Sequence, residues 1–356
     1  MLLRALLTIT ILAAGGCAGS RGYTEPHAPT GGGSGGGATE GAPANIETAG
    51  LPLQVLDART GHQMDTAAFW KTLAGARAVC VGEEHTNPHH HWVQLEVVKH
   101  LVAQPRLALG MEMFQRPFQA VLDDYAAGKI DAAALRSRSG YADRWGYDWG
   151  FYAPTIAAVV AAKGTLLALN APRELTKQVV HHGLDSLSPE EKAQLPELNL
   201  KDAAHRAWFD ALMEDMGGGA AHSSTPAPAA APVASPHHAE GDGSGEAAAP
   251  SMPSPDAIYT VQVIWDETMA DTSAKWLAAN PQGHLVILAG GGHCHDSAIV
   301  NRLKRRGVKD VVSIKTVVDD GEGALAEALV KPINDYLVVL TISKAQRDAE
   351  AKKSGE

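Results

Sequence analysis

The chain has little positive charge and few cysteines, and each shortage excludes a class of protein. Its 356 residues hold 30 Lys and Arg against 40 Asp and Glu, a net charge of −10. Such an acidic chain is poorly suited to general binding of nucleic-acid phosphates. Three cysteines are too few for a scaffold built from disulfides. Hydrophobic residues make up 45% of the chain, so it can bury a sizeable core and is not disordered throughout.

The first apolar run is also too short to cross a membrane. In residues 1–17, Arg4 precedes the run Ala5–Ala14, whereas a bilayer span needs about 20 apolar residues, so the segment fits a secretory signal peptide. Small residues then lead to Cys17, a pattern that resembles a bacterial lipobox with a lipidated cysteine. The alternative is an ordinary signal peptide with an incidental cysteine. Because Ala18 is not Asp, we expect an outer-membrane lipid anchor, with the domain in the periplasm or at the cell surface.

Two further stretches have a composition that cannot form a core. Residues 18–50 are rich in Gly, which predicts a flexible tether. Residues 217–257 contain seven Pro and no Leu, Ile, Phe, Trp or Tyr, which predicts a disordered insertion. We therefore expect one domain over residues 51–342, interrupted by the insertion and followed by a charged tail over residues 343–356.

Short apolar runs alternate with amphipathic stretches along this domain. The strand candidates are Ala78–Gly82, Leu107–Met113, Thr165–Leu169, Leu285–Ala289, Val311–Ile314 and Tyr336–Leu340. Buried strands separated by helices predict an α/β domain with a mostly parallel sheet flanked by helices. Ligands of such sheets bind outside the carboxyl ends of the strands, so functional residues are expected directly after them.

Two of the intervening stretches have clear helical patterns. One runs from Asn87, a good N-cap, to Val102. Its apolar face is expected to carry Trp92, Leu95, Val98 and Val102. The second covers Ser297–Arg306 and ends in a basic turn, where the helix dipole favours cations.

Two strand candidates are each followed by the pattern Gly-x-x-His. The first is Gly82–His85 and the second is Gly290–His293. Glycine lets a ligand approach the backbone closely, and the histidine is expected near a helix N-terminus at the edge of the sheet. Glu112 lies inside a third, otherwise apolar strand, where a carboxylate is costly to bury unless it is paired. We interpret Glu112 as a site residue, with a purely structural carboxylate as the alternative.

The residues beside these motifs leave several alternatives open. Of Glu83 and Glu84, one is expected to point inward and the other to cap the turn. His89–His91 open the next helix, where we expect a solvated first turn with at most one or two rings facing the site. Cys294 is either a metal ligand or a packed thiol. A disulfide between Cys80 and Cys294 is possible but is not demanded by the sequence.

Aromatic residues are scarce overall, at 5% of the chain, but they gather between residues 141 and 152. The members of this group are Tyr141, Trp145, Tyr147, Trp149, Phe151 and Tyr152. They form either a packing corner between a helix and a loop, or a wall for a flat apolar ligand with a tyrosine hydroxyl as ligand.

At these stretches the sequence resembles the ChaN-type haem-binding lipoproteins. The matching segments follow the family order over most of residues 51–310: VGEEHTNPHHH, LALGMEMFQRPFQ, WGYDWGFYAP, LALNAPREL, VIWDETMA and ILAGGGHCHD. The insertion precedes the family's Gln-x-x-x-Asp-x-x-Met-Ala stretch, which is here Gln262, Asp266, Met269 and Ala270. The resemblance implies an α/β domain that binds a stacked pair of haems between two subunits, hence a homodimer, and that serves haem or iron uptake.

The resemblance also implies a tyrosine as the axial ligand of the haem iron. Tyr152 is the first candidate, followed by Tyr147 and Tyr141. The chain is richer in histidine than this pattern, which makes further ligand candidates of His85, His293 and His295.

The two Gly-x-x-His motifs resemble, in addition, a wider superfamily that includes Tiki/TraB-type metalloproteases and erythromycin-esterase-like hydrolases. That resemblance implies an active centre of His85, Glu112 and His293. Together with Glu84 these side chains could hold a divalent metal ion with an open position for water. Without a metal, a histidine polarised by a glutamate could act as general base. The alternative function is therefore a hydrolase, either an esterase or a peptidase.

Overall fold

The computed structural model describes residues 53–217 and 253–348. The expected lipobox with Cys17, the expected tether, and residues 218–252 of the expected insertion lie outside this part of the chain. Residues 53–209 and 253–348 belong to one compact unit, and the end of the helix before the insertion, Asp210–Gly217, belongs to another. The helices on the two sides of the gap end at Gly217 and begin at Pro255.

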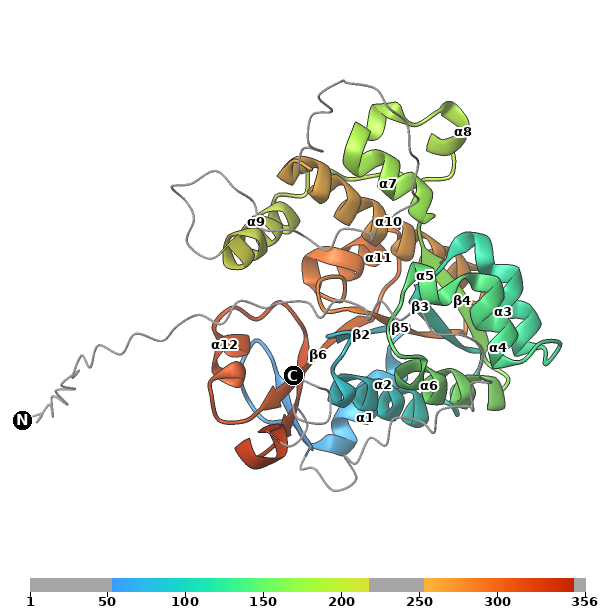
Figure 1. The fold of residues 1–356 in the computed structure, drawn as a ribbon. Coiled ribbons are helices and arrows are strands. Elements are labelled where there is room, and N and C mark those ends of the chain that lie inside the picture. Colours follow the sequence, from blue (N-terminus) through green and yellow to red (C-terminus); the bar gives the residue numbers. More distant parts are fainter. Residues whose placement is uncertain (1–52, 218–252, 349–356) are drawn as a thin grey trace, which may run out of the picture. The chain divides into compact units, whose positions relative to one another are not determined.

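A seven-stranded sheet forms the centre of the main unit (Figure 1). Its order is β1-β7-β6-β2-β5-β3-β4, and all neighbours are parallel except β1 and β7. The strands are β1 (Leu53–Asp57), β2 (Ala78–Glu83), β3 (Leu107–Gln115), β4 (Thr165–Asn170), β5 (His284–Gly290), β6 (Val311–Asp319) and β7 (Tyr336–Thr341). The mostly parallel α/β fold expected from the sequence is confirmed. The strand β1, at the antiparallel edge, was not expected.

Helices cover both faces of the sheet. The α-helices are α1 (Thr66–Gly75), α2 (Pro88–Leu101), α3 (Gln119–Ala126), α4 (Ala132–Ser139), α5 (Tyr141–Arg144), α6 (Trp149–Ala161), α7 (Arg173–His182), α8 (Pro189–Lys192), α9 (Ala203–Gly217), α10 (Pro255–Ala279), α11 (Asn301–Arg305) and α12 (Ala324–Val330). Short helical turns are η1 (Arg116–Phe118), η2 (Leu184–Ser186) and η3 (Asp296–Val300). Among the described residues, no helix is long and apolar enough to span a membrane.

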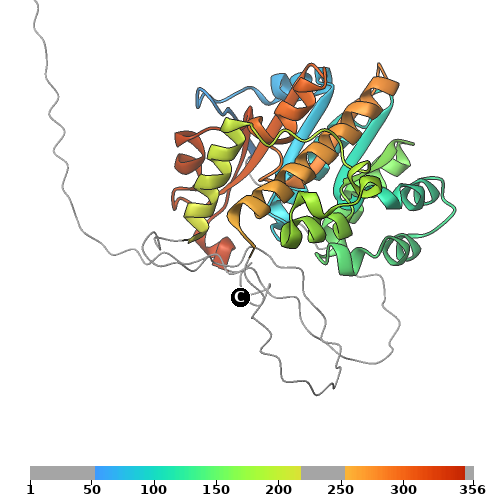
Figure 2. The same cartoon turned by 90° about the horizontal axis from the view of Figure 1, so that it is seen from above.

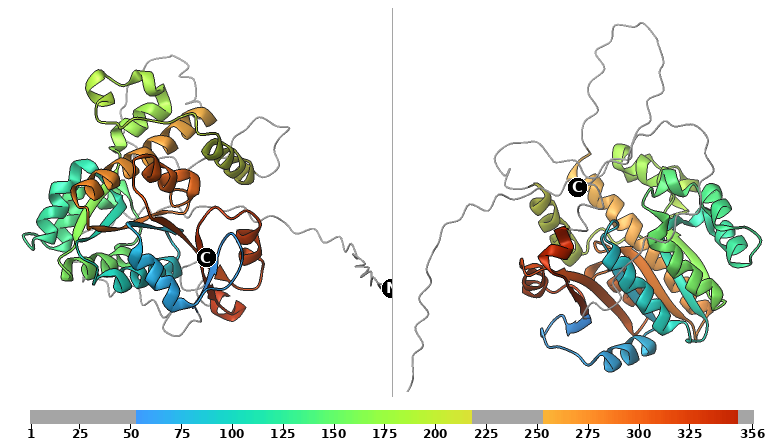
Figure 3. Two further views of the ribbon diagram at one scale, coloured as in Figure 1. Left: turned by 180° about the vertical axis from the view of Figure 1, so that it is seen from behind. Right: turned by 60° about the horizontal axis from the view of Figure 1, so that its bottom comes forward.

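The alternation of side chains along β2 shows how the two layers arise. Val79 and Val81 pack into a core with α1, α2 and α6, whereas Ala78 and Cys80 pack into a second core with α10 and α11. Successive residues of a strand point to opposite faces, so a strand covered on both sides reads as a continuous apolar run. Figure 1 shows α1, α2 and α6 below the sheet and α10 and α11 above it, Figure 2 shows α10 lying along the sheet, and Figure 3 shows the two layers from behind.

Two helices differ from their expected form. In α2 the buried face contains His91, Gln94, Val97 and Leu101, while Trp92 and Leu95 are only half-buried. The expected face was right for Val98, which is fully buried, and wrong for Trp92 and Leu95, because the buried face also takes up histidine and glutamine side chains. The segment expected as one helix over residues 297–306 is a π turn, η3, followed by α11, with a non-helical residue at Ala298.

Candidate functional site

The two Gly-x-x-His motifs begin at the same edge of the sheet. Strands β2 and β5 are parallel neighbours, and Glu83 at the end of β2 pairs with Gly290 at the end of β5. A Cβ atom on Gly82 would lie 3.1 Å from the Cα of Gly291 and 3.4 Å from the Cβ of Cys294. Glycine at this position therefore permits the close packing of the two motifs.

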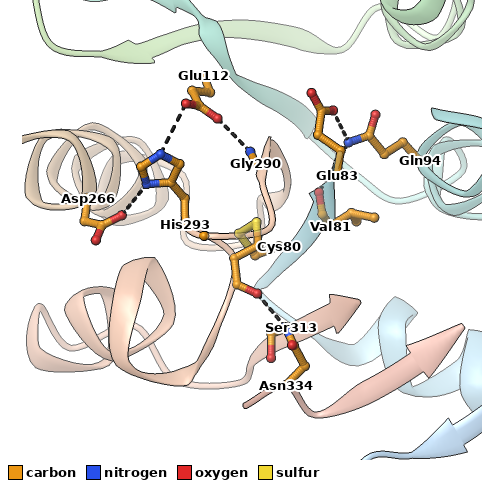
Figure 4. The surroundings of a disulfide bond; sticks show 12 residues. Cys80, Val81, Glu83, Gln94, Glu112, Asp266, Gly290, His293, Ser313 and Asn334 are labelled. Carbon is orange, nitrogen blue, oxygen red and sulfur yellow. Dashed lines mark hydrogen bonds and ion pairs between the residues drawn. A yellow bond between two sulfur atoms is a disulfide. The ribbon is translucent and has the colours of Figure 1, made fainter. Parts of the chain in front are cut away.

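A disulfide joins the motifs covalently. Cys80 of β2 is bonded to Cys294 of the loop after β5, across a Cα–Cα distance of 5.3 Å (Figure 4). The amide of Asn334 donates a hydrogen bond of 2.6 Å to the carbonyl of Cys294. Of the alternatives left open by the sequence, the disulfide is the one the structure contains, so Cys294 has no thiol to offer a metal. The bond secures the backbone next to His293.

His293 lies between two carboxylates (Figure 4). Its Nδ1 is 2.7 Å from Asp266 Oδ1, and its Nε2 is 3.3 Å from Glu112 Oε1. The backbone amide of Gly290 donates to the second oxygen of Glu112 at 2.7 Å. Burial opposes a charge on the ring, but the carboxylates of Glu112 and Asp266 outweigh it and raise the pKa of His293 to about 10. As placed, His293 is a fixed imidazolium with both ring nitrogens hydrogen-bonded.

Helix α10 supplies Asp266, and the buried side chains of His205 and Arg302 lie against this residue. Nε2 of His205 lies 3.0 Å and Nη1 of Arg302 lies 3.7 Å from Asp266 Oδ2. Burial raises the pKa of Asp266, but Arg302 and His293 lower it more, so the carboxyl stays ionised. The next residue, Glu267, is fully buried and pairs with arginines of the α11 segment, including Arg306 at 2.7 Å. Sequence reasoning placed Asp266 in a family motif but missed its contact with His293.

The other motif histidine, His85, is held on one side only. Its Nδ1 is 2.8 Å from Glu83 Oε1, and 27% of its side chain is exposed. Within the described residues, no protein group makes a hydrogen bond to its Nε2. A Cβ on Gly290 would lie 3.1 Å from Cε1 of this ring and 3.7 Å from Glu112 Oε2, so the glycine keeps the space beside both side chains open. Burial lowers the pKa of His85, but the hydrogen bond to Glu83 and the nearby carboxylates raise it above its ordinary value.

Glu83 is the buried centre of this half of the site. Its side chain is 1% exposed. It accepts hydrogen bonds from the hydroxyl of Tyr152 at 2.7 Å and from Nε2 of Gln94 at 2.6 Å. Burial opposes its charge, but His85 and His91 lower the pKa of Glu83 to about 2. Of the two adjacent glutamates, Glu83 thus points inward, and the exposed Glu84 accepts from the side chain of Asn87 in the turn.

Two residues of the aromatic segment lie against His85. Trp145 meets the imidazole edge-on and Tyr147 lies tilted against it, each with ring centroids 4.7 Å apart, and both are half-buried. Tyr152 is 0% exposed and Tyr141 is 4% exposed, so these two candidate ligands lie in the core. Of the three tyrosines, Tyr147 lies nearest the surface beside His85. The segment therefore combines a packing corner with a partly exposed aromatic wall.

The three consecutive histidines contradict the expectation of a solvated turn. His89 and His90 are 5% exposed and His91 is 0% exposed. His91 lies 3.5 Å from Glu83 Oε2 and stacks on Phe151, while Nδ1 of His90 accepts from the backbone amide of Glu84 at 2.8 Å. The rings of His90 and His91 are buried against the loop that carries Glu83, and His91 also lies 3.0 Å from the carbonyl of His85. No feature of the sequence pattern pointed to this.

The remaining candidate, His295, packs away from solvent. It is 0% exposed and its ring lies 4.2 Å from that of Trp208. Burial lowers its pKa to about 3, so it is neutral. Among the residues that the structure describes, no group of three His, Cys, Asp or Glu side chains could hold a metal ion. The four expected metal ligands, Glu84, His85, Glu112 and His293, do not converge on one point. Glu84 is exposed in its turn, and both ring nitrogens of His293 are engaged by carboxylates.

The chain matches a family model and has similarities to solved structures. A family model described as haem-binding uptake, Tiki superfamily, ChaN matches residues 69–303. The solved structure titled "Cofacial heme binding to ChaN of Campylobacter jejuni" is 16% identical, with a TM-score of 0.56, over 81% of this chain and 96% of that chain. At this identity the likeness shows the fold alone. An erythromycin esterase mutant in its open conformation is 12% identical with a TM-score of 0.39, over 85% of this chain and 87% of that chain. None of the curated proteins compared with the chain matches it.

Proposed function

Since the chain belongs to the ChaN family of haem-binding uptake proteins, we propose that it binds haem at the carboxyl edge of its sheet, with Nε2 of His85 as the iron ligand. The observation that carries the proposal is the one-sided hold on His85. Glu83 accepts from Nδ1 at 2.8 Å, and Nε2 has no hydrogen-bond partner within the described residues. Histidines that ligate metals generally donate their other ring N–H to a carboxylate or carbonyl, which fixes the tautomer and orients the ring.

The surroundings of His85 suit a flat, apolar ligand. Trp145 and Tyr147 lie within 4.7 Å of the imidazole, measured between ring centroids, and both remain half-buried. Aromatic side chains provide large apolar contact areas with little loss of conformational entropy. A haem bound here would supply the iron atom that His85 ligates, and the protein would keep the haem in solution. Its binding requires the neutral imidazole, so the Nε2 proton leaves when iron is bound.

The other histidines fit the role of ligand less well. His293 has both ring nitrogens directed at carboxylates, and an imidazolium has no lone pair for iron. His295 is fully buried. The family resemblance implies a tyrosine ligand. Of the three candidate tyrosines, Tyr147 lies beside His85, whereas Tyr152 and Tyr141 are buried in the core.

Haemin titration of the mature full-length chain tests the proposal. We expect saturable binding, and an iron–histidine stretching band in the resonance Raman spectrum of the ferrous protein. His85→Ala should weaken binding at least tenfold and abolish the band. His100→Ala is the matched control, since His100 is an exposed histidine on α2, the helix that follows the His85 turn, and stacks on Trp70. Loss of binding in Tyr147→Phe, with His85→Ala unaffected, would transfer the ligand to Tyr147, and no saturable binding would refute the function.

The proposal includes a location and a process. Cys17 is lipidated and anchors the chain in the outer membrane, residues 18–50 tether the domain, and the bound haem serves haem or iron uptake, with two subunits forming a dimer. The residue pattern of 1–17 supports the anchor, and the family supports uptake. Incorporation of labelled palmitate that is abolished in Cys17→Ser tests the anchor. Its absence in the wild-type chain would leave an ordinary signal peptide.

A second candidate function rests on the same pair of residues. The imidazole of His85, hydrogen-bonded through Nδ1 to the carboxylate of Glu83, also has the geometry of a general base. The second candidate is therefore an esterase or peptidase that uses this histidine and glutamate. His293, as an imidazolium, does not fit that role. Turnover of chromogenic ester or peptide substrates by the haem-free protein, lost in His85→Ala and kept in His100→Ala, would support the hydrolase. No turnover would remove it.

A further inference from the structure

Tyr152 lies directly behind the candidate ligand, on the buried side of Glu83. We infer that Tyr152 is a positioning residue of the haem site: its hydroxyl fixes the carboxylate of Glu83, which in turn sets the orientation of the His85 ring and leaves Nε2 for the iron. The inference rests on the proposed function, and it gives Tyr152 a role other than the axial ligation that the family resemblance implies. It follows from hydrogen-bond geometry within the described residues.

Each oxygen of Glu83 has its own partners. Oε1 is 2.7 Å from the hydroxyl of Tyr152 and 2.8 Å from Nδ1 of His85. Oε2 is 2.6 Å from Nε2 of Gln94 and 3.5 Å from Nδ1 of His91. A carboxylate held at both oxygens cannot rotate without breaking hydrogen bonds that the buried site cannot replace with water. The proton acceptor for His85 therefore has one orientation.

Tyr152 is itself held in place from the opposite side. It comes from α6, is 0% exposed, and its hydroxyl accepts from the indole Nε1–H of Trp145 at 3.1 Å. The ring of Trp145 meets that of His85 edge-on, 4.7 Å between centroids. Trp145, Tyr152, Glu83 and His85 thus form a closed ring of contacts. One hydroxyl sets both the direction of the imidazole and the position of an aromatic ring beside it.

The same contacts exclude Tyr152 as the ligand in this arrangement. Its hydroxyl donates to Glu83 and accepts from Trp145, and the side chain has no exposed surface. An iron ligand must face the bound haem, and only His85 of this ring of contacts both has an open nitrogen and reaches the surface.

Tyr152→Phe tests the inference, because it removes the hydroxyl and keeps the packing ring. Tyr141→Phe is the matched control: Tyr141 is also buried, and its hydroxyl has no hydrogen-bond partner within the described residues. The first measurement uses the haem-free protein, at a pH where the His85 ring is neutral. ¹⁵N chemical shifts should report a proton on Nδ1 in the wild type and in Tyr141→Phe, and a mixture of tautomers in Tyr152→Phe.

The second measurement is haemin affinity. Loss of an outer-shell partner typically costs 10–100-fold in affinity for the metal group, so we expect that loss in Tyr152→Phe, with the iron–histidine band retained. Disappearance of the band would instead make Tyr152 the ligand, and unchanged tautomer and affinity would also overturn the inference. If the variant fails to fold, Trp145→Phe removes the donor to the same hydroxyl and should shift the tautomer in the same direction. If the wild type binds no haem, the proposed function fails, while the tautomer still decides whether Tyr152 orients His85.

Discussion

Removing the disulfide should cost a large share of the stability of this domain. Cys80 and Cys294 are separated by 214 residues in sequence, and closing so long a loop restricts the unfolded chain strongly. The chain-entropy relation for a loop of this length gives about 5 kcal/mol. Measured values often fall below that relation, so we expect Cys80→Ala/Cys294→Ala to lower the free energy of unfolding by about 3–5 kcal/mol.

The loss should be felt at the site as well as globally. Cys294 directly follows His293, and Gly291 packs against Gly82 so closely that a Cβ on Gly82 would lie 3.1 Å from the Cα of Gly291. Without the covalent link, the loop that presents His293 to Asp266 and Glu112 is held only by non-covalent contacts. We therefore expect faster amide hydrogen exchange at Gly291–Cys294 in the double variant.

Urea-induced unfolding of the mature chain, followed by tryptophan fluorescence, measures the global effect. The wild type must first be shown to contain the disulfide by thiol titration under denaturing conditions, because a reduced wild type would make the comparison empty. A double variant that unfolds within about 1 kcal/mol of the oxidised wild type would refute the loop-entropy argument.

Two further predictions concern charge and packing. His293 has a folded-state pKa of about 10 against about 6.5 when unfolded, so its stabilising charge is fully effective below pH 6.5 and is lost as the pH rises toward 10. Urea titrations should therefore show a steeper loss of stability over that range in the wild type than in His293→Gln, and equal slopes would contradict the assignment. Gly164→Ala should cost about 1–3 kcal/mol, since its Cβ would lie 2.6 Å from Val159 Cγ1 and 2.9 Å from the carbonyl oxygen of Leu107. Gly75→Ala is the control, because a Cβ on Gly75 would have no neighbouring atom within 4 Å. A Gly164→Ala domain as stable as the control would contradict the prediction, since it would show that the atoms around Gly164 move to accept the Cβ.

The sheet could be predicted because its strands are buried on both faces. Ala78–Glu83 and His284–Gly290 read as short apolar runs ending in glycine or a carboxylate, and parallel strands bring their carboxyl ends to one edge. The juxtaposition of the two Gly-x-x-His motifs follows from that rule. Strand β1 follows no such rule, since it joins the antiparallel edge and pairs with β7 at the far end of the chain.

The partners of the two histidines could not be predicted in the same way. Asp266 lies on α10, a helix whose register against the sheet is set by packing that no local pattern encodes. The burial of His91 and Gln94 was missed because their polarity predicts a solvent-facing position, yet Glu83 requires their donors. The burial of polar residues on an apolar helix face can be predicted only when the buried charged group that they contact, here the carboxylate of Glu83, is known.

The same motif therefore yields two different chemical groups. Glu83 engages one nitrogen of His85, and the other has no hydrogen-bond partner among the described residues, whereas Asp266 and Glu112 engage both nitrogens of His293. The difference lies in the helices that pack against the motifs and not in the Gly-x-x-His pattern, because α10 brings the carboxylate of Asp266 to His293 and α6 brings the neutral hydroxyl of Tyr152 behind His85. A hydroxyl stabilises Glu83 without supplying a second anion to His85. Repeating a motif at one sheet edge thus produces one nitrogen available for a ligand and one fixed positive charge, with Glu112 neutralising the latter.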